Sequence, residues 1–233
     1  MNKYPRHTRD VSDLREAAKK YVLPGYVPPQ PVFSRDEQVW AIGSCFAENI
    51  TAELRAQGIK TAVTQLSETI NSPALVLRSL SESGAKDILS HFNIAVITLG
   101  LAANEIDGQW VPSTVAEVKQ ELSGIVQEVR EANPRIKIFF TLSPVPINRA
   151  MWSASPIIAD TISKATIRAA LAEFFYSKPA EVYYWPAYEI VRGLGMHRPR
   201  HFGADDNETR HVSKDVVRVV VDLFIESWFR PLS

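Results

Sequence analysis

The chain contains one cysteine, Cys45, which lies between a short apolar run and an amphipathic segment. A thiol at the first turn of a helix lies beside free backbone N–H groups and the positive end of the helix dipole, and both favour the thiolate. Gly43, two residues earlier, permits a sharp turn between a strand and that helix. Two interpretations of Cys45 stay open, a small buried apolar side chain or a nucleophile, and Ser44 is either a competing nucleophile or the helix N-cap.

A thiol nucleophile needs a base, and His211 is the first candidate. Glu208 precedes it by one turn of chain, a spacing at which a carboxylate can hold one imidazole nitrogen while the other faces outward. Asp205 and Asp206 are alternative partners, and His201 is a rival histidine. The Glu208…His211 pair gains weight from its position just before the last helix of a chain that also carries a thiol after its first strand.

These side chains need a scaffold that brings distant segments together. Short apolar runs predict buried strands at residues 39–42, 59–63, 94–99, 136–142 and 181–185. Amphipathic segments between and after them predict helices at residues 46–58, 73–80, 114–133, 160–175 and 213–228. The alternation predicts an α/β fold, a five-stranded parallel sheet with helices on both faces, and ligands bind such sheets beyond the carboxyl ends of the strands.

Composition narrows the class of protein. The 233 residues are 45% hydrophobic, and 26 basic side chains balance 26 acidic ones, so no basic field draws in a nucleic acid. No apolar run approaches the roughly 18 residues of a membrane span, and the polar N-terminus does not resemble a signal peptide. We therefore expect a cytoplasmic protein that binds neither nucleic acid nor membrane. No metal-ligand cluster or glycine-rich phosphate loop is evident, so we expect no metal and no cofactor.

The N-terminal segment differs from the rest of the chain. Prolines cluster in residues 24–31 and block both helix and inner strand there. We expect residues 1–36 to form an arm that packs on the domain or is partly flexible. Residues 37–233 are then a single α/β domain.

Several motifs recur in a fixed order along this domain. The chain resembles the GSCFA domain family, within the SGNH/GDSL hydrolase superfamily, and the resemblance spans about residues 39–229. It rests on Gly43-Ser44-Cys45-Phe46-Ala47, Thr98-Leu99-Gly100, Phe140-Thr141-Leu142-Ser143-Pro144-Val145, Ser163-Lys164, Tyr184-Trp185-Pro186-Ala187-Tyr188-Glu189 and the pair Glu208 and His211. It implies a three-layer flavodoxin-like fold of the SGNH type.

The resemblance also implies roles for residues. Cys45 falls on the nucleophile of the superfamily, His211 on its base and Glu208 on the acid that orients the imidazole. The oxyanion would be held by the backbone N–H of Cys45 and by donors from the loops after the second and third strands. The oxyanion and substrate-binding candidates are Ser44, Ser67, Asn71, Gly100, Asn104 and Ser143.

The chain departs from the family pattern in those loops. Ser67 replaces a glycine, so a donor that needs left-handed backbone is lost or shifted. The usual pattern after Gly100 is absent, which leaves Asn104 as the candidate donor there. Glu208 replaces an aspartate, which moves the carboxylate by one methylene.

The leading hypothesis is an acyl hydrolase, an esterase or deacylase, that forms an acyl-thioester on Cys45. Its substrate would be a small-molecule or carbohydrate ester. The first alternative is an acyltransferase that moves the acyl group from an acyl-thioester donor to a small-molecule or sugar acceptor. The second is a catalytically silent binding domain that keeps the fold. A homodimer is also possible.

Overall fold

The computed structural model describes residues 3–66, 71–82 and 84–231. Five parallel strands form the central sheet, and their bounds are β1 (Val39–Gly43), β2 (Thr61–Gln65), β3 (Ile94–Leu99), β6 (Lys137–Leu142) and β7 (Val182–Tyr184). They lie in the order β2-β1-β3-β6-β7. The register places Val39 of β1 beside Thr61 of β2 on one side and Ile94 of β3 on the other.

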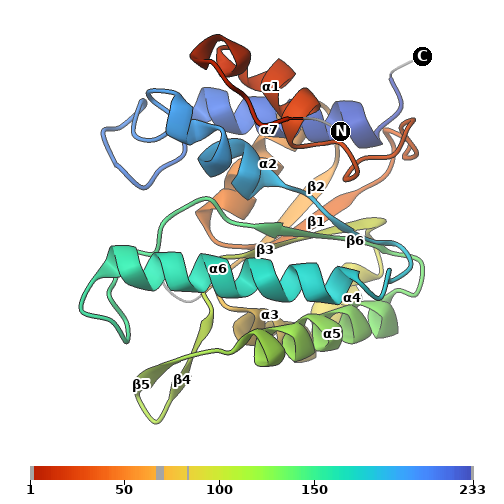
Figure 1. The fold of residues 1–233 in the computed structure, drawn as a ribbon. Helices are drawn as coiled ribbons and strands as arrows, with labels where there is room; N and C mark the ends of the chain where they lie inside the picture. Colours follow the sequence, from red (N-terminus) through yellow and green to blue (C-terminus); the bar gives the residue numbers. More distant parts are fainter. Residues whose placement is uncertain (1–2, 67–70, 83, 232–233) are drawn as a thin grey trace.

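Helices cover both faces of the sheet, as Figure 1 shows. On one face lie α1 (Leu14–Tyr21), α2 (Cys45–Ala56) and α7 (Lys214–Trp228). On the other lie α3 (Pro73–Ser81), α4 (Ala85–Leu89), α5 (Val115–Ala132) and α6 (Pro156–Phe175). Side chains alternate across a strand, so in β1 Val39 and Ala41 pack toward α2 and α7 while Trp40 and Ile42 pack toward α3 and α5. The three-layer α/β prediction is confirmed.

Sequence patterns also locate the helix ends. Thr114 and Glu117 form a reciprocal capping box at the start of α5, with the Glu117 backbone N–H donating to Thr114 Oγ1 at 3.2 Å. Ser155 caps α6 and precedes Pro156, which occupies the first turn. The helix therefore starts four residues before the position predicted from the sequence. The predicted start was too late because Ile157 and Ile158 are apolar but exposed, so they do not follow the pattern of a helix with one buried face.

A β-hairpin follows β3 that the sequence analysis does not predict. Its strands are β4 (Ala103–Ile106) and β5 (Gln109–Pro112), paired antiparallel. The turn consists of Asp107 and Gly108, both with positive φ, and Asp-Gly is a favoured pair for a tight hairpin turn. The hairpin extends away from the sheet in Figure 1.

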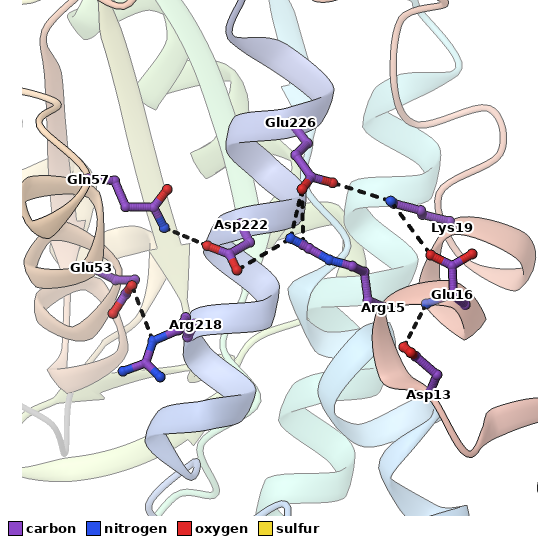
Figure 2. A network of polar contacts seen from close by, with 9 residues as sticks. All are labelled: Asp13, Arg15, Glu16, Lys19, Glu53, Gln57, Arg218, Asp222 and Glu226. Atoms are coloured by element: carbon purple, nitrogen blue, oxygen red, sulfur yellow. Dashed lines mark hydrogen bonds and ion pairs between the residues drawn. The ribbon is translucent and has the colours of Figure 1, made fainter. Parts of the chain in front are cut away.

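The N-terminal arm contacts α7 through charged side chains, which Figure 2 shows. Arg15 on α1 lies 2.7 Å from a Glu226 carboxylate oxygen and 3.4 Å from one of Asp222. Asp222 also accepts a hydrogen bond from Gln57 Nε2, just after α2. Beyond this network, the backbone N–H of Phe33 donates to the carbonyl of Trp228 at 2.8 Å.

We also searched the helices for candidate membrane spans. None of the helices in the described residues combines the length and the apolar composition that a bilayer crossing requires.

Candidate active site

The order of the strands defines where a ligand should bind. The chain passes from β1 to β2 on one side and then returns to β3 on the other side of β1. This reversal leaves a crevice beyond the carboxyl ends of β1 and β3. Ser44 and Cys45 follow β1, and Gly100 follows β3.

Gly43 makes the turn from β1 into α2 possible. A Cβ atom at this position would lie 1.8 Å from Thr98 Oγ1 on the neighbouring strand β3. The Thr98 hydroxyl sits there because it donates a 2.8 Å hydrogen bond to the carbonyl of Ile42. The close approach of β1 and β3 therefore requires a glycine at position 43. Ser44 and Cys45, which follow it, lie at the crevice.

Cys45 is half-buried at the first position of α2, where Ser44 occupies the N-cap. It borders a narrow cavity of about 10 Å³, about the space of one water molecule. The side chains and backbone around this cavity belong to Ser44, Cys45, Asn71, Gly100, Leu101, Ser143, Val145, Pro146, Ile147 and Lys164. Five predicted site residues, Ser44, Cys45, Asn71, Gly100 and Ser143, thus meet at one place.

Asn71 has the most unusual environment of this group. Its carbonyl oxygen accepts 2.9 Å hydrogen bonds from the backbone N–H groups of Gly100 and Leu101, which fixes the loop after β2 against the end of β3. Its side chain is 3% exposed, and neither amide atom has a hydrogen-bond partner in the described structure. A buried unpaired amide costs about 1–3 kcal/mol, and here it borders the cavity beside Cys45.

The two serines at the cavity differ in their hydrogen bonding. The backbone N–H of Ser143 donates to Leu99 O at 2.8 Å, and its hydroxyl accepts from the backbone N–H of Val145 at 3.3 Å. Ser44 is buried, and its side chain makes no cap hydrogen bond to α2.

A buried charged cluster lies beneath the cavity. Lys164 on α6 is 2% exposed, and its ammonium donates a 2.8 Å hydrogen bond to Gly100 O. Asp160, one turn earlier, lies 3.8 Å from that ammonium and 2.8 Å from a guanidinium nitrogen of Arg192. Burial lowers the pKa of Lys164 from its ordinary 10.5 to about 8, opposed mainly by the carboxylate of Asp160. Lys164 therefore stays mostly protonated at neutral pH.

The carboxylate partner of His211 differs from the prediction. His211 Nδ1 forms a 2.6 Å hydrogen bond with Asp206 Oδ2, which leaves Nε2 directed away from the carboxylate. Hydrogen bonding from His211 and from the Glu208 backbone lowers the pKa of Asp206. The Glu208 side chain is exposed. Glu208 contacts His211 through its backbone carbonyl, which accepts a 2.9 Å hydrogen bond from the His211 N–H.

The reason for this exchange is the local turn. The Glu208 N–H also donates to Asp206 Oδ1 at 2.9 Å. This hydrogen bond holds the Asp206 carboxylate over the turn, beside the His211 imidazole. Asp206 was one of the alternatives left open by the sequence.

The rival histidine, His201, has a structural role. It is 5% exposed, its Nδ1 lies 3.0 Å from Val191 O, and its Nε2 accepts a 3.2 Å hydrogen bond from Arg198 Nε. Burial lowers the pKa of His201. Both ring nitrogens are thus occupied, which leaves none for proton transfer.

One predicted oxyanion residue, Asn104, is not among the described residues that border the narrow cavity. Asn104 lies on β4, and its amide nitrogen donates to Ser113 Oγ at 3.3 Å and Glu121 Oε1 at 3.2 Å. The hairpin therefore turns this side chain toward α5, where its amide nitrogen is already hydrogen-bonded. Ser67 lies outside the described residues.

A larger cavity adjoins the narrow one. Its volume is about 360 Å³, and it shares Pro146 and Ile147 with the narrow cavity. Ile157 forms an apolar part of its wall, while Arg192 and Arg210 bring positive charge. The pair of cavities thus joins the thiol of Cys45 to a space large enough for a small organic group.

A further cavity, of about 390 Å³, lies away from the strand ends, between α6 and β7. Arg168 there is already bound to Glu189 at 2.6 Å and to Tyr26 Oη at 3.0 Å. We assign no chemistry to it.

Sequence reasoning missed three charged residues of the site: Asp160, Lys164 and Arg192. A signal was available on α6, because Asp160 and Lys164 stand at helical spacing with the buried Ile167 and Leu171. Two charges on the buried face of a helix indicate a paired interior cluster. In the described part of the chain, no group of three His, Cys, Asp or Glu side chains is arranged to hold a metal ion.

The comparisons with known proteins concern the family and the fold. The model of the GSCFA family matches residues 110–224, a range that contains His211 and Lys164 and begins after Cys45. The family resemblance inferred from the sequence motifs is confirmed. Comparison with curated protein sequences gives no match.

Solved structures show the same fold. A GDSL-like lipase from Parabacteroides merdae superposes with a TM-score of 0.54 at 13% identity, covering 85% of this chain and 98% of that one. For the lipase Lip_vut3 from a goat rumen metagenome the TM-score is 0.51 at 10% identity, covering 81% and 95%. The salicylyl-acyltransferase SsfX3 from a tetracycline biosynthetic pathway has a TM-score of 0.51 at 14% identity, covering 82% and 54%. At these identities the likeness shows the fold alone.

Proposed function

We propose that this chain, which matches the GSCFA family over residues 110–224 and has an SGNH-type fold, is an acyl hydrolase with Cys45 as its nucleophile. The observation that carries the proposal is the position of Cys45 at a helix N-terminus, beside a cavity that also contains the unpaired amide of Asn71. Its substrate would be a small-molecule or carbohydrate ester.

The reaction begins at the thiol. His211 Nε2 takes up the thiol proton as Cys45 Sγ attacks the carbonyl carbon of the ester, and the carbonyl oxygen gains the negative charge of a tetrahedral intermediate. The intermediate collapses to an acyl-thioester as the C–O bond to the alcohol breaks. His211 Nε2 supplies the proton that the leaving alkoxide takes up, and then removes a proton from the incoming water.

The proposed oxyanion hole uses two donors. The backbone N–H of Cys45 lies at the first turn of α2, where N–H groups lack helical partners. The Nδ2 group of Asn71 is the second donor, and binding an oxyanion would satisfy a buried amide that has no hydrogen-bond partner among the described residues. The narrow cavity has about the volume that a single oxygen atom needs.

His211 is oriented by Asp206 in this scheme. A carboxylate on Nδ1 holds the tautomer that leaves Nε2 free to accept a proton, and it stabilises the imidazolium that follows. Glu208 would then contribute only backbone hydrogen bonds, to Asp206 and His211, that hold the turn.

An acyltransferase is the second candidate, and the adjoining cavity of about 360 Å³ favours it. A small-molecule or sugar acceptor held there would attack the thioester in place of water, and an acyl-thioester donor would be a chemically matched source of the acyl group. The two activities share every step up to the acyl-enzyme.

Intact-mass spectrometry after exposure to p-nitrophenyl esters and to acyl-thioesters tests the shared step. We expect a single acyl adduct on the wild-type protein and none on Cys45→Ala. Ser44→Ala is the matched control, because it removes the neighbouring hydroxyl and keeps the thiol. An adduct that persists in Cys45→Ala would remove the thiol from the mechanism, and the absence of any adduct would favour a silent binding domain.

Comparing acyl release with and without candidate alcohols then separates hydrolysis from transfer. Hydrolysis predicts release at the same rate in both conditions. Transfer predicts that an acceptor accelerates release and appears acylated in the products.

A further inference from the structure

The buried cluster under the cavity carries one more positive charge than negative charge. Asp160 is a single carboxylate, and it pairs with both Lys164 and Arg192, at 3.8 Å and 2.8 Å. Buried charges are costly unless they are compensated. Lys164 is the fully buried cation, whereas the Arg192 side chain is 24% exposed and takes the closer contact with Asp160. A second anion beside Lys164 would therefore stabilise the cluster.

Lys164 is positioned to hold that anion. Its ammonium is fixed by a 2.8 Å hydrogen bond to Gly100 O, at the end of β3. Lys164 and Cys45 border the same narrow cavity, so the ammonium would stabilise a negative charge on the thiol. Besides Cys45 on α2, the ionisable groups that act on Lys164 are Asp160 on α6 and Arg192, which lies in the turn Glu189–Gly193.

We propose that Lys164 is the counter-cation of a Cys45 thiolate in the resting protein. The thiol proton is released to solvent, and the thiolate completes a cluster of two cations and two anions. In this proposal Lys164 acts through Cys45. This inference rests on the proposed function, because it concerns how the proposed nucleophile is activated, but its test needs no substrate.

A thiolate paired with Lys164 changes the role of His211. A thiolate that forms before the substrate arrives needs no base for its attack. His211 then serves only the later proton transfers: it gives the leaving alkoxide a proton that it has taken up from solvent, and it regains one from the attacking water or acceptor. The thiolate should consequently be present in a His211→Ala variant.

Alkylation by iodoacetamide, which carries no charge, measures the thiolate directly. The rate rises with pH as the thiol ionises, and the single cysteine makes the intact mass specific to Cys45. An ordinary thiol ionises near pH 8.5. We expect a midpoint at least about 1 pH unit lower in the full-length protein, since a nearby opposite charge shifts a pKa by about 1–3 units.

Variants assign the shift to one residue. Lys164→Met keeps the length of the side chain and removes the charge, and it should raise the midpoint by about 1 unit or more. Lys164→Arg should keep a lowered midpoint. Lys119→Met is the matched control, because Lys119 is an exposed lysine on α5 that pairs with Glu173 at 3.5 Å, and it should leave the midpoint unchanged.

A reciprocal measurement protects the test if Lys164→Met does not fold. Removing the thiolate in Cys45→Ala should lower the pKa of Lys164, read from the ¹³Cε shift of this lysine across a pH series. A wild-type midpoint at or above 8.5 would overturn the proposal, as would an unchanged lysine pKa in Cys45→Ala. A midpoint that depends on His211 and not on Lys164 would transfer the role to the histidine. If the midpoint is low and no acyl-enzyme forms, the proposed function fails while this inference stands.

Discussion

Asp206 Oδ2 and His211 Nδ1 are joined by a 2.6 Å hydrogen bond in the loop that leads into α7. The two residues are five positions apart, and the contact forms because Asp206 also accepts a hydrogen bond from the Glu208 backbone within the same turn. Glu208 itself turns outward. In this structure, the acid of the proposed catalytic set is therefore an aspartate, although the resemblance to the family pattern points to the glutamate.

Replacing these two acids separately distinguishes them. Asp206→Asn removes the carboxylate that orients His211, and we expect kcat to fall by about 10²–10⁴, because a wrongly held imidazole is a poor base. Glu208→Gln should change kcat less than about twofold, since only its backbone contacts the turn. Steady-state hydrolysis of an activated ester measures both. Equal losses in the two variants would contradict the assignment of Asp206.

A second pair of variants concerns the oxyanion. Asn71→Ala should lower kcat by about 10²–10³, the usual effect of losing one donor to the developing negative charge. The stability of Asn71→Ala should change little, because the lost amide makes no hydrogen bond in the described structure and the backbone contacts remain. A loss of activity that is matched by unfolding would show a structural role instead.

Asn104→Ala is the control for that prediction. This amide donates to Ser113 and Glu121 on the hairpin side of α5. We expect normal kcat and a loss of about 1 kcal/mol in the free energy of unfolding, the usual contribution of such hydrogen bonds. Urea unfolding followed by circular dichroism checks the stability of both variants.

Most of the scaffold was predictable from the sequence, because its signals are local. The apolar run that forms β3 is long and buried along its length, and the capping box of α5 is a short-range pattern. The β4–β5 hairpin was also marked locally, by Asp107 and Gly108. It was missed because its strands are mostly exposed and lack an alternating apolar pattern.

The site was predictable only in part, because its parts meet through the fold. The place of Cys45 follows from a strand, a glycine and a helix in sequence. The hydrogen bond from Lys164 to Gly100 O joins residues 64 positions apart, and the sequence around Lys164 does not indicate this acceptor. Asp206 rather than Glu208 contacts His211 because of the geometry of one turn. Residue propensities alone do not determine that geometry.

The close approach at Gly43 gives a prediction about stability. Gly43→Ala would place a Cβ 1.8 Å from Thr98 Oγ1, so the strands or the side chain must move, and we expect a loss of about 1–3 kcal/mol or more. In a Thr98→Ala background the same change should cost less, since the clashing oxygen is gone. A double-mutant cycle by urea unfolding measures this coupling. Additive losses would mean that the turn, and not the contact with Thr98, requires glycine.

The last prediction concerns pH and the buried Lys164. Its pKa is about 8 in the folded protein and 10.5 when unperturbed. Between these values the unfolded chain holds a proton that the folded protein has released, so stability rises with pH through this window. The pKa difference corresponds to about 3 kcal/mol.

Lys164→Met lacks this titration and is the reference. The free energy of unfolding of the wild type, relative to that of Lys164→Met, should therefore increase from about pH 8 to pH 10.5 and change little below pH 7, apart from the contribution of Cys45. Measuring both proteins in a Cys45→Ala background removes that contribution and keeps the lysine. Because Cys45 raises the pKa of Lys164, the window should then begin at a lower pH. Parallel stability profiles of the two proteins across the window would show that Lys164 ionises in the folded protein as it does in water.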